Sequence, residues 1–322
     1  MAVGDSEPCT DCTSGPSRLV ESAPRAIAIL NRRGRPDDDH APGMTITLLD
    51  GPLGTVLNER GIPTPLPGWS AHALEHAPDA VLQIHADYAR AGARVHTTNT
   101  FRTKSRTFPD TWAELTATAV RVCREGASRG DARAGRRPLV AGSLAPLEDC
   151  YRPDLAPADP RPEHRELASR LAELGCDLLL CETFPSVDEG LVAVEEAVAT
   201  SLPTWAAFTA GPEADLLTPS ELRRAAREAV ERGAEAVLVN CVPVARTLAY
   251  VEALAGLGVP FGAYANAGRP DEEFGWRSAP GAPERYADEA ERWVAAGATL
   301  IGSCCGTGPE HTAVLARRFG DG

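Results

Sequence analysis

Short apolar runs alternate with segments of helical periodicity from Met44 onward. The apolar runs are rich in β-branched residues or alanine and fall near residues 45–50, 94–101, 138–144, 177–182, 203–209, 235–241, 259–265 and 298–303. Such runs are typical of parallel strands, which are buried on both faces. Between them, hydrophobic positions follow the period of an amphipathic helix, for example over 79–92, 111–130, 187–200 and 219–234. Eight strands that each precede a helix predict an α/β protein with a single (β/α)8 TIM-type barrel.

The first 43 residues do not share this pattern. They carry scattered Pro, Gly and Ser and the charged run RRGRPDDDH, a composition typical of a disordered leader. Met44 stands directly before the first strand-like run, so a start assigned too far upstream would produce the same pattern. We therefore expect residues 1–43 to be a disordered leader or a mis-assigned start, and residues 44–322 to be the barrel. Cys9 and Cys12 form a lone C-x-x-C there, without the second pair of a zinc site.

The composition limits the partners of the protein. The chain has 45 acidic residues against 32 Lys and Arg, and its net charge of −13 opposes binding to nucleic acid or to an anionic membrane. No apolar run approaches the roughly 18 residues of a membrane span, and the N-terminus does not resemble a secretory signal. We therefore expect a cytoplasmic protein with small-molecule partners, whose nine cysteines stay reduced. The oligomeric state stays open.

Polar residues gather where the predicted strands end. Barrel enzymes bind and react at the carboxyl-terminal ends of their strands, so these residues are the first candidates for a site. They are Asp50, Asn99, Ser143, Glu182, Asn240, Cys241, Asn266, Cys304 and Cys305. Long loops follow the first, third and seventh strands, and we expect them to cover this mouth.

Three cysteines in this set indicate a metal site. Cys241 ends the sixth predicted strand, and Cys304 and Cys305 end the eighth. The flanking Gly302 and Gly306 let the backbone leave the strand, so that adjacent cysteines can face one target. Zn²⁺ suits three sulfur ligands and leaves a fourth position for water or substrate. An inert buried pair or a vicinal disulfide is the alternative interpretation.

The charge of such a site selects its chemistry. Three thiolates around Zn²⁺ leave a net charge of −1, which makes the site a poor source of hydroxide. The same site can bind a substrate thiol as a thiolate that remains nucleophilic. The reaction that this predicts is alkyl transfer onto sulfur.

Six segments carry a characteristic set of motifs. They are DGPLGTVLNERG (50–61), TTNTF (97–101), CETFPSVDE (181–189), VNCVP (239–243), YANAG (264–268) and GSCCGTGPEH (302–311). Together they resemble the zinc-dependent homocysteine S-methyltransferase family, over residues 44–322. The resemblance implies that Cys241, Cys304 and Cys305 hold zinc, that the homocysteine sulfur takes the fourth position, and that a methyl group transferred to it gives methionine.

The resemblance also assigns the amino-acid end of the substrate. Asp50, in the D-G motif, and Glu182, in the C-E-T motif, would bind it. A structural alternative exists for each, because Asp50 can cap the first βα turn and Glu182 can pair with a rim arginine. Burying a carboxylate without a cation is costly, and a substrate ammonium would supply the missing charge. This cost favours substrate binding for both acids.

Further residues are candidates for the same site. Asn99 and Asn240 are either loop-ordering hydrogen-bond partners or substrate contacts. Asn266 is an expected oxygen ligand of the fourth zinc position when no thiol is bound. Gly51, with Gly54, is expected to let the backbone approach the ligand closely.

The methyl donor is the open question. The resemblance allows sulfonium or ammonium donors, or a methylated corrinoid supplied by a partner. Trp69 matches a tryptophan that betaine-using relatives place beside their onium donor, where a cation–π contact favours binding. Arg102 stands where those relatives carry Tyr; if it faces the pocket, its charge opposes betaine and suits the carboxylate of S-methylmethionine. We therefore favour S-methylmethionine.

Two other interpretations stay open. The same zinc–thiolate chemistry can act on another thiol or on a selenol. A protein with this Cys₃ zinc site can also sense thiols or redox state without turnover.

Overall fold

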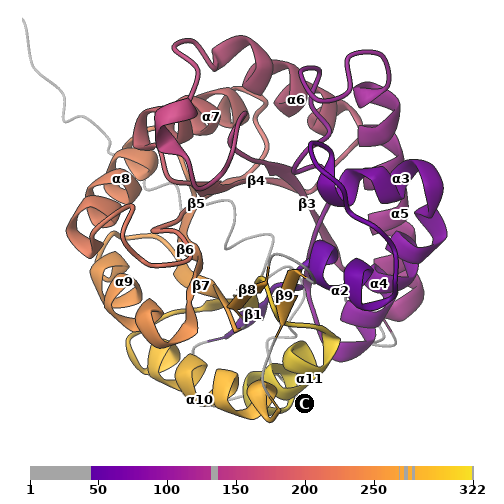
Figure 1. Ribbon diagram of the computed structural model, residues 1–322. Helices are drawn as coiled ribbons and strands as arrows, with labels where there is room; N and C mark the ends of the chain where they lie inside the picture. Colours follow the sequence, from indigo (N-terminus) through magenta and orange to yellow (C-terminus); the bar gives the residue numbers. More distant parts are fainter. Residues whose placement is uncertain (1–44, 132–136, 268, 272–274, 278–279, 321–322) are drawn as a thin grey trace, which may run out of the picture.

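The structure, a computed structural model, describes residues 45–131, 137–267, 269–271, 275–277 and 280–320. The expected leader, with Cys9 and Cys12, lies outside the described residues. Eight parallel strands form one sheet in the order β1-β10-β7-β6-β5-β4-β3-β2. They are β1 (Thr47–Leu48), β2 (Val95–Thr97), β3 (Leu139–Leu144), β4 (Leu178–Phe184), β5 (Thr204–Phe208), β6 (Ala236–Pro243), β7 (Phe261–Asn266) and β10 (Leu300–Ser303). A parallel bridge between Leu49 and Val95 joins the two ends of this order into a barrel (Figure 1).

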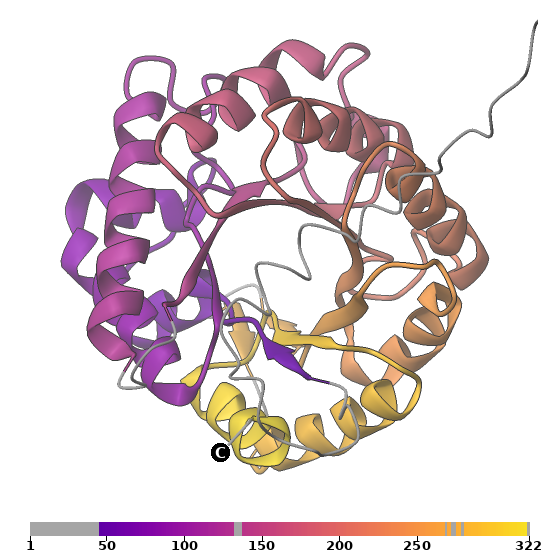
Figure 2. The same ribbon diagram turned by 180° about the vertical axis from the view of Figure 1, so that it is seen from behind.

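Helices form a ring around the barrel, as the views from its two ends show (Figure 1 and Figure 2). They are α2 (Leu53–Glu59), α3 (His72–His76), α4 (Pro78–Ala91), α5 (Trp112–Gly130), α6 (Arg161–Glu173), α7 (Val187–Ala199), α8 (Pro219–Glu231), α9 (Thr247–Leu254), α10 (Ala282–Ala295) and α11 (Pro309–Phe319), with short 3₁₀ turns η1 (Trp69–Ala71), η2 (Pro153–Leu155) and η3 (Val244–Arg246). The connection from β7 to α10 contains the antiparallel pair β8 (Arg269–Asp271) and β9 (Gly275–Arg277). The predicted (β/α)8 barrel is confirmed. Within the described ranges, no helix is both long and apolar enough to cross a bilayer.

The second strand is shorter than the sequence pattern predicts. It was expected to reach residue 101, but β2 ends at Thr97. The chain then turns, because the Thr100 N–H bonds to the Thr98 carbonyl at 2.8 Å and the two hydroxyls also lie 2.8 Å apart. β-Branched threonines favour strands, but hydroxyls that bond nearby groups compete with the sheet ladder. The turn brings the rest of the TTNTF segment to the mouth of the barrel.

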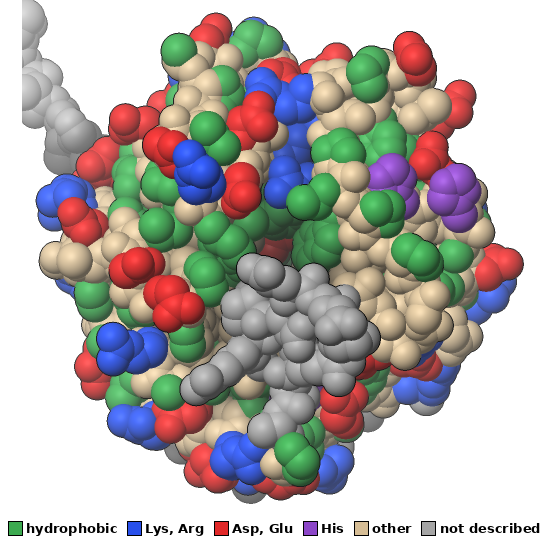
Figure 3. Space-filling model, viewed as in Figure 1, with side chains coloured by type: hydrophobic (Ala, Val, Ile, Leu, Met, Phe, Trp, Pro, Cys, Tyr) green, Lys and Arg blue, Asp and Glu red, His purple; other side chains and the backbone are tan. Residues whose placement is uncertain are grey.

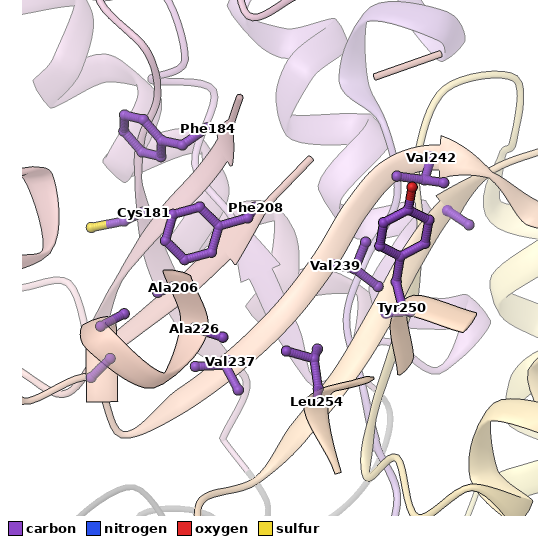
Figure 4. Packing of buried hydrophobic residues seen from close by; sticks show 14 of the residues in the cluster. Cys181, Phe184, Ala206, Phe208, Ala226, Val237, Val239, Val242, Tyr250 and Leu254 are labelled. Carbon is purple, nitrogen blue, oxygen red and sulfur yellow. The ribbon is translucent and has the colours of Figure 1, made fainter. Parts of the chain in front are cut away.

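The buried side chains of the strands form two layers. Alternate residues of β5 show the division: Trp205 and Ala207 belong to a cluster inside the barrel, and Ala206 and Phe208 to one between strands and helices. Figure 4 shows Phe208 in the cluster between strands and helices, which also contains Tyr250 from α9. Because side chains fill the inside of the barrel, a ligand is expected at the rim.

Local sequence explains where the helices that follow β4 and β5 begin. Ser186 precedes α7, and its hydroxyl accepts a hydrogen bond from the Glu189 N–H at 3.4 Å. Thr218 and Glu221 form a capping box at the start of α8, where Pro219 is the first helical residue. These caps satisfy N–H groups that the first turn of a helix leaves without partners.

Candidate active site at the mouth of the barrel

A pocket opens at the carboxyl-terminal ends of the strands. Its volume of about 760 Å³ includes space open to solvent, and Figure 3 shows the mouth as a hollow bordered by hydrophobic side chains. None of the described residues that line it is Lys or Arg. Its lining includes the strand-end residues Asp50, Glu182, Cys241, Cys304 and Cys305 and the loop residues Trp69, Asn99, Phe101, Cys150 and Tyr151.

The three candidate zinc cysteines converge in this pocket. The Sγ atoms of Cys241 and Cys304 are 2.8 Å apart, and those of Cys304 and Cys305 are 4.0 Å apart. All three sulfur atoms lie within 4.8 Å of one another, and all three thiols are free. The structure therefore brings together residues that are 64 positions apart in the chain at their widest, from 241 to 305.

An irregular stretch of β6 directs the first of these sulfurs. The pairing of β6 with β7 shifts register between Asn240 and Pro243, and Cys241 between them has a φ of +52°. A residue other than glycine in this region costs roughly 1–3 kcal/mol, which the surrounding structure must offset. Strain of this kind is typical of residues that serve a site.

Gly302 and Gly306, on either side of the two cysteines that follow β10, serve different purposes. Cys304 and Cys305 follow the strand, and Gly306 turns the chain with a φ of +77°. This agrees with the expectation that a glycine lets the backbone depart here. Gly302 instead allows close packing, because a Cβ at this position would lie 2.8 Å from the Cβ of Leu49.

The donor set suits zinc. A tetrahedral ion with Zn–S bonds of about 2.3 Å holds its ligands roughly 3.7 Å apart. The Sγ separations of 2.8 and 4.0 Å in this cluster lie on either side of that spacing. The hydrogen bond with Cys304, and after it burial, raise the pKa of the Cys241 thiol well above its usual value. Three thiolates at this place therefore need a nearby cation.

Asn266, the last residue of β7, gives a second indication of a missing partner. Its side chain is 1% exposed, and neither its amide oxygen nor its amide nitrogen has a hydrogen-bond partner among the described residues. A buried amide without partners is costly, and a metal, a water or a ligand would satisfy it.

Asp50 follows β1 and is held by the backbone of β2. The Thr97 N–H donates to Asp50 Oδ2 at 2.9 Å, and the same oxygen lies 3.8 Å from His85 Nδ1 and 4.0 Å from His96 Nδ1. Burial lowers the pKa of His85 to about 3, so this imidazole is neutral at physiological pH and does not balance the carboxylate. Burial also raises the pKa of Asp50 well above its usual value, because removal from water disfavours the charged form.

Glu182, in β4, accepts hydrogen bonds from two neutral hydroxyls. Ser143 donates to Oε1 at 2.5 Å, and Tyr264 donates to Oε2 at 3.0 Å. Burial raises the pKa of Glu182. In the described part of the chain, its carboxylate has no ion pair with the rim arginine that the structural alternative requires. Tyr264 was not a candidate, although it opens the YANAG motif.

Asn99 and Asn240 both make hydrogen bonds that hold the mouth of the barrel. Ser70 donates from its hydroxyl to Asn99 Oδ1 at 2.7 Å, and Asn99 Nδ2 donates to the Ser70 carbonyl at 2.9 Å. Asn240 exchanges two hydrogen bonds with Thr183. Asn99 lines the pocket, whereas Asn240 is not among the lining residues. Asn99 therefore makes a loop-ordering contact, whereas Asn240 joins the strands β4 and β6. Contact with a substrate stays a prediction for both.

Gly51 and Gly54 leave room for the side chains of neighbouring residues. A Cβ at Gly51 would lie 2.7 Å from the Tyr88 hydroxyl, and a Cβ at Gly54 would lie 2.7 Å from Cε2 of Trp69. Gly54 therefore seats the Trp69 ring, which meets Phe101 edge-on with centroids 5.9 Å apart. Both glycines also line the pocket, so their expected approach to a ligand stays a prediction.

Comparison with known proteins identifies the family. The family described as Homocysteine S-methyltransferase matches residues 47–319. The chain belongs to this family. It is 31% identical to a homocysteine S-methyltransferase of Escherichia coli (strain K12), with 85% of this chain and 95% of that enzyme covered. It is also 30% identical to an S-methylmethionine–homocysteine S-methyltransferase of Pongo abelii, with 78% and 72% covered.

A solved structure agrees with this assignment. The metallated form of the homocysteine methyltransferase MmuM from Escherichia coli superposes with a TM-score of 0.73 at 27% identity, over 90% of this chain and 98% of that one. The resemblance found in the motifs is therefore confirmed, and the protein is an enzyme of the homocysteine S-methyltransferase family.

Two loop residues of this methyltransferase were overlooked or misplaced in the sequence analysis. Cys150 was not singled out as a site residue, but it lines the pocket beside Tyr151. Arg102 is absent from the lining; its Nη1 donates to the Glu148 carbonyl at 2.9 Å and its guanidinium lies 5.6 Å from the centroid of Phe101. Arg102 therefore holds a neighbouring loop, and the pairing with a donor carboxylate that depended on its facing the pocket is not supported.

Proposed function

We propose that this methyltransferase moves a methyl group from an onium donor, S-methylmethionine in preference to betaine, to the thiol of homocysteine, giving methionine. One observation carries the proposal: three cysteine sulfurs share a pocket with two buried carboxylates, and no described Lys or Arg lines it. The sulfurs suit a thiol acceptor, and the carboxylates suit the ammonium group of an amino acid. The names of the relatives in Escherichia coli and Pongo abelii support the same acceptor.

The proposed cofactor is one Zn²⁺. Cys241, Cys304 and Cys305 would hold it, and Asn266 is the proposed oxygen ligand in the absence of a thiol. The support is the three converging sulfurs and the unsatisfied amide of Asn266. When bound, such an ion lowers the pKa of a substrate thiol and keeps the sulfur nucleophilic.

Asp50 and Glu182 would bind the α-ammonium group of homocysteine. Each is buried, and each receives hydrogen bonds from neutral donors that orient its carboxyl group. The ammonium would bring the positive charge that these carboxylates otherwise lack. Binding at one end of the substrate would in this way fix the position of its sulfur at the other end.

The charge of the pocket favours a cationic donor. In the proposed step, the methyl carbon forms a bond to the homocysteine sulfur while its bond to the donor sulfur breaks. The electron pair of the broken bond stays on the departing sulfur, so a sulfonium becomes a neutral thioether and the thiol proton is released to solvent. S-methylmethionine is favoured over betaine because a sulfonium is intrinsically the better methyl donor.

A combined metal and activity measurement tests the proposal. The purified enzyme should hold one zinc per chain and convert homocysteine with S-methylmethionine faster than with betaine at equal concentrations. The same activity assay should also test a selenol acceptor, other thiols and the addition of a corrinoid protein. Full activity in a metal-free preparation would refute the zinc chemistry, and zinc binding without turnover would favour the sensor. Faster turnover with betaine, or a requirement for corrinoid, would refute the donor alone.

A further inference from the structure

A lysine and a glutamate side chain hold the two ends of one buried peptide group beside the pocket. Lys104 donates from Nζ to the Pro146 carbonyl, and Glu189 Oε1 accepts the Leu147 N–H at 2.7 Å. The Pro146 carbonyl and the Leu147 N–H belong to the same peptide unit. We call this arrangement the Lys104–Glu189 clamp. It fixes the connection from β3 to α6, because neither end of that peptide can turn without breaking a hydrogen bond to a buried side chain.

Burial makes the Lys104–Glu189 clamp unusual. Lys104 is the only lysine of the chain, and both Lys104 and Glu189 are 3% exposed. Burial, with a smaller contribution from Arg102, lowers the pKa of Lys104 to about 7, and Glu189 opposes this shift. Charged side chains are almost never buried unless they are paired. Lys104 and Glu189 are linked to each other through the clamped peptide group, and Glu189 Oε1 also lies 3.3 Å from His164 Nε2. Their hydrogen bonds to backbone therefore serve the position of that backbone, since burying charged groups gains little stability by itself.

The clamped connection leads directly into the pocket wall. Cys150 and Tyr151 come three and four residues after Leu147, and both line the pocket. Phe101 lines the same pocket, and its ring centroid lies 6.0 Å from Lys104 Nζ. Lys104 therefore joins two parts of the wall, the loop that follows β2 and the loop that follows β3.

The pocket has two parts, the strand ends and the loops, and this division indicates which ligand contacts the wall that contains Phe101, Cys150 and Tyr151. The thiol acceptor is assigned to the strand ends, with its sulfur at the cysteines and its ammonium at Asp50 and Glu182. The remaining lining contains the aromatic residues Trp69, Phe101 and Tyr151, which come from the loops after β1, β2 and β3. Aromatic faces attract a cation such as a sulfonium.

We propose that Lys104 and Glu189 are positioning residues, which hold the loop after β3 so that Tyr151 and Phe101 form the wall that receives the onium donor. This inference rests on the proposed function. It assigns to the clamp an effect on donor binding that is separate from the binding of zinc and homocysteine.

Steady-state kinetics of Lys104→Met test the inference. Methionine keeps the length of the stem but leaves the Pro146 carbonyl without its donor. We expect the KM for S-methylmethionine to rise by about tenfold, with zinc content unchanged and the KM for homocysteine within about twofold of wild type. The matched control is Arg121→Met, which removes a cation from the surface of α5, where the Arg121 side chain is 59% exposed. It should change neither KM.

A second variant keeps the inference testable if Lys104→Met does not fold. In Glu189→Gln the amide oxygen can still accept from Leu147, so a smaller rise of about threefold in the donor KM is expected. An unchanged donor KM, or equal rises in both KM values with loss of zinc, would overturn the inference in either variant. Failure of the proposed function would instead appear in the wild type, as no turnover with an onium donor.

Limited proteolysis gives a readout that does not depend on turnover. Arg152, one residue after Tyr151, has a side chain that is 57% exposed. Chymotrypsin should cleave the Tyr151–Arg152 bond faster in Lys104→Met than in wild type or Arg121→Met, because the loop is no longer held. Equal cleavage rates would show that Lys104 does not order the loop and would overturn the inference.

Discussion

Asn240 and Thr183 exchange two hydrogen bonds between strands that are not neighbours. The Thr183 N–H donates to Asn240 Oδ1 at 3.2 Å, and Asn240 Nδ2 donates to Thr183 Oγ1 at 2.7 Å. Thr183 follows Glu182, Asn240 precedes Cys241, and both Thr183 and Cys241 have positive φ. β5 lies between the two strands. The pair therefore links the residue proposed to bind the substrate ammonium with a proposed zinc ligand.

Replacing Asn240 should damage both ends of the site. Asn240→Ala removes both hydrogen bonds and leaves the buried Thr183 N–H without a partner, so the free energy of unfolding should fall by about 1–3 kcal/mol. Zinc affinity should fall and the KM for homocysteine should rise, because Cys241 and Glu182 lose their link. Thermal unfolding and zinc titration measure these effects. Thr183→Val removes only the side-chain bond and should have the smaller effect; equal damage from both would contradict this account.

Each of the three pocket cysteines should be required for zinc. Cys241→Ser, Cys304→Ser and Cys305→Ser should each lose bound zinc and methyl transfer together, since three sulfur donors are needed to hold the ion. Cys176→Ala is the matched control, because Cys176 is as buried as Cys241 and Cys305 but lies in the cluster between strands and helices. Metal analysis and activity on the same preparations are the measurements. A serine variant that keeps both zinc and full activity would remove that residue from the ligand set.

Glu182→Gln should raise the melting temperature at high pH while it weakens the binding of homocysteine. Burial raises the folded-state pKa of Glu182 above its usual value of 4.5, so the wild type loses stability as pH rises from that value through the raised pKa. Glutamine resembles the neutral form. The variant should therefore melt above the wild type at pH 8, and this difference should shrink toward pH 4.

The same substitution should weaken homocysteine binding. A neutral amide cannot balance the substrate ammonium, so the KM for homocysteine should rise by about tenfold or more at pH 8. In the wild type, the KM for homocysteine should fall as pH rises, because Glu182 and Asp50 must lose their protons to bind a cation. A variant with unchanged KM would leave Glu182 with a structural role only.

Gly54 and Trp69 should show coupled effects. Gly54→Ala places a methyl group against the indole ring and should cost about 1–3 kcal/mol of stability, with a higher KM for the donor. In a Trp69→Phe background the smaller ring leaves space, so the same change should cost less. A double-mutant cycle by chemical denaturation measures the difference. Additive effects would show that the ring and the glycine do not interact.

The sequence was sufficient for the barrel, for the family and for the convergence of three cysteines. Repeated apolar runs and helical segments predict the eight strand–helix units, and the positions of Cys241, Cys304 and Cys305 at strand ends predict their convergence. This succeeds because a closed barrel brings the ends of all strands to one rim. The polar ends of consecutive strands are therefore neighbours in space whatever their distance along the chain.

The residues that the sequence did not reveal belong to loops and to strand interiors. The loop after β3 was expected to cover the mouth, and its Tyr151 lines the pocket, but Cys150 beside it was not a candidate. Arg102 turns to the Glu148 carbonyl rather than to the pocket. Tyr264 lies inside a strand, and its role as a partner of Glu182 depends on the register of β4 and β7 around the barrel. Long-range packing decides these positions, and periodicity carries no information about it.

The closure of the barrel at β1 has a consequence for how the enzyme responds to its substrate. β1 has two residues and meets β2 through the Leu49–Val95 bridge, with hydrogen bonds from the Arg94 N–H to the Leu48 carbonyl and from the Asp50 N–H to the Val95 carbonyl. Few hydrogen bonds therefore hold this seam between β1 and β2 closed. Amide hydrogens at the seam should exchange with deuterated water sooner than those of β6. Because Asp50 belongs both to the seam and to the proposed substrate site, an amino acid bound to its carboxylate should slow exchange at the seam, and the barrel should be most tightly closed when this site is occupied.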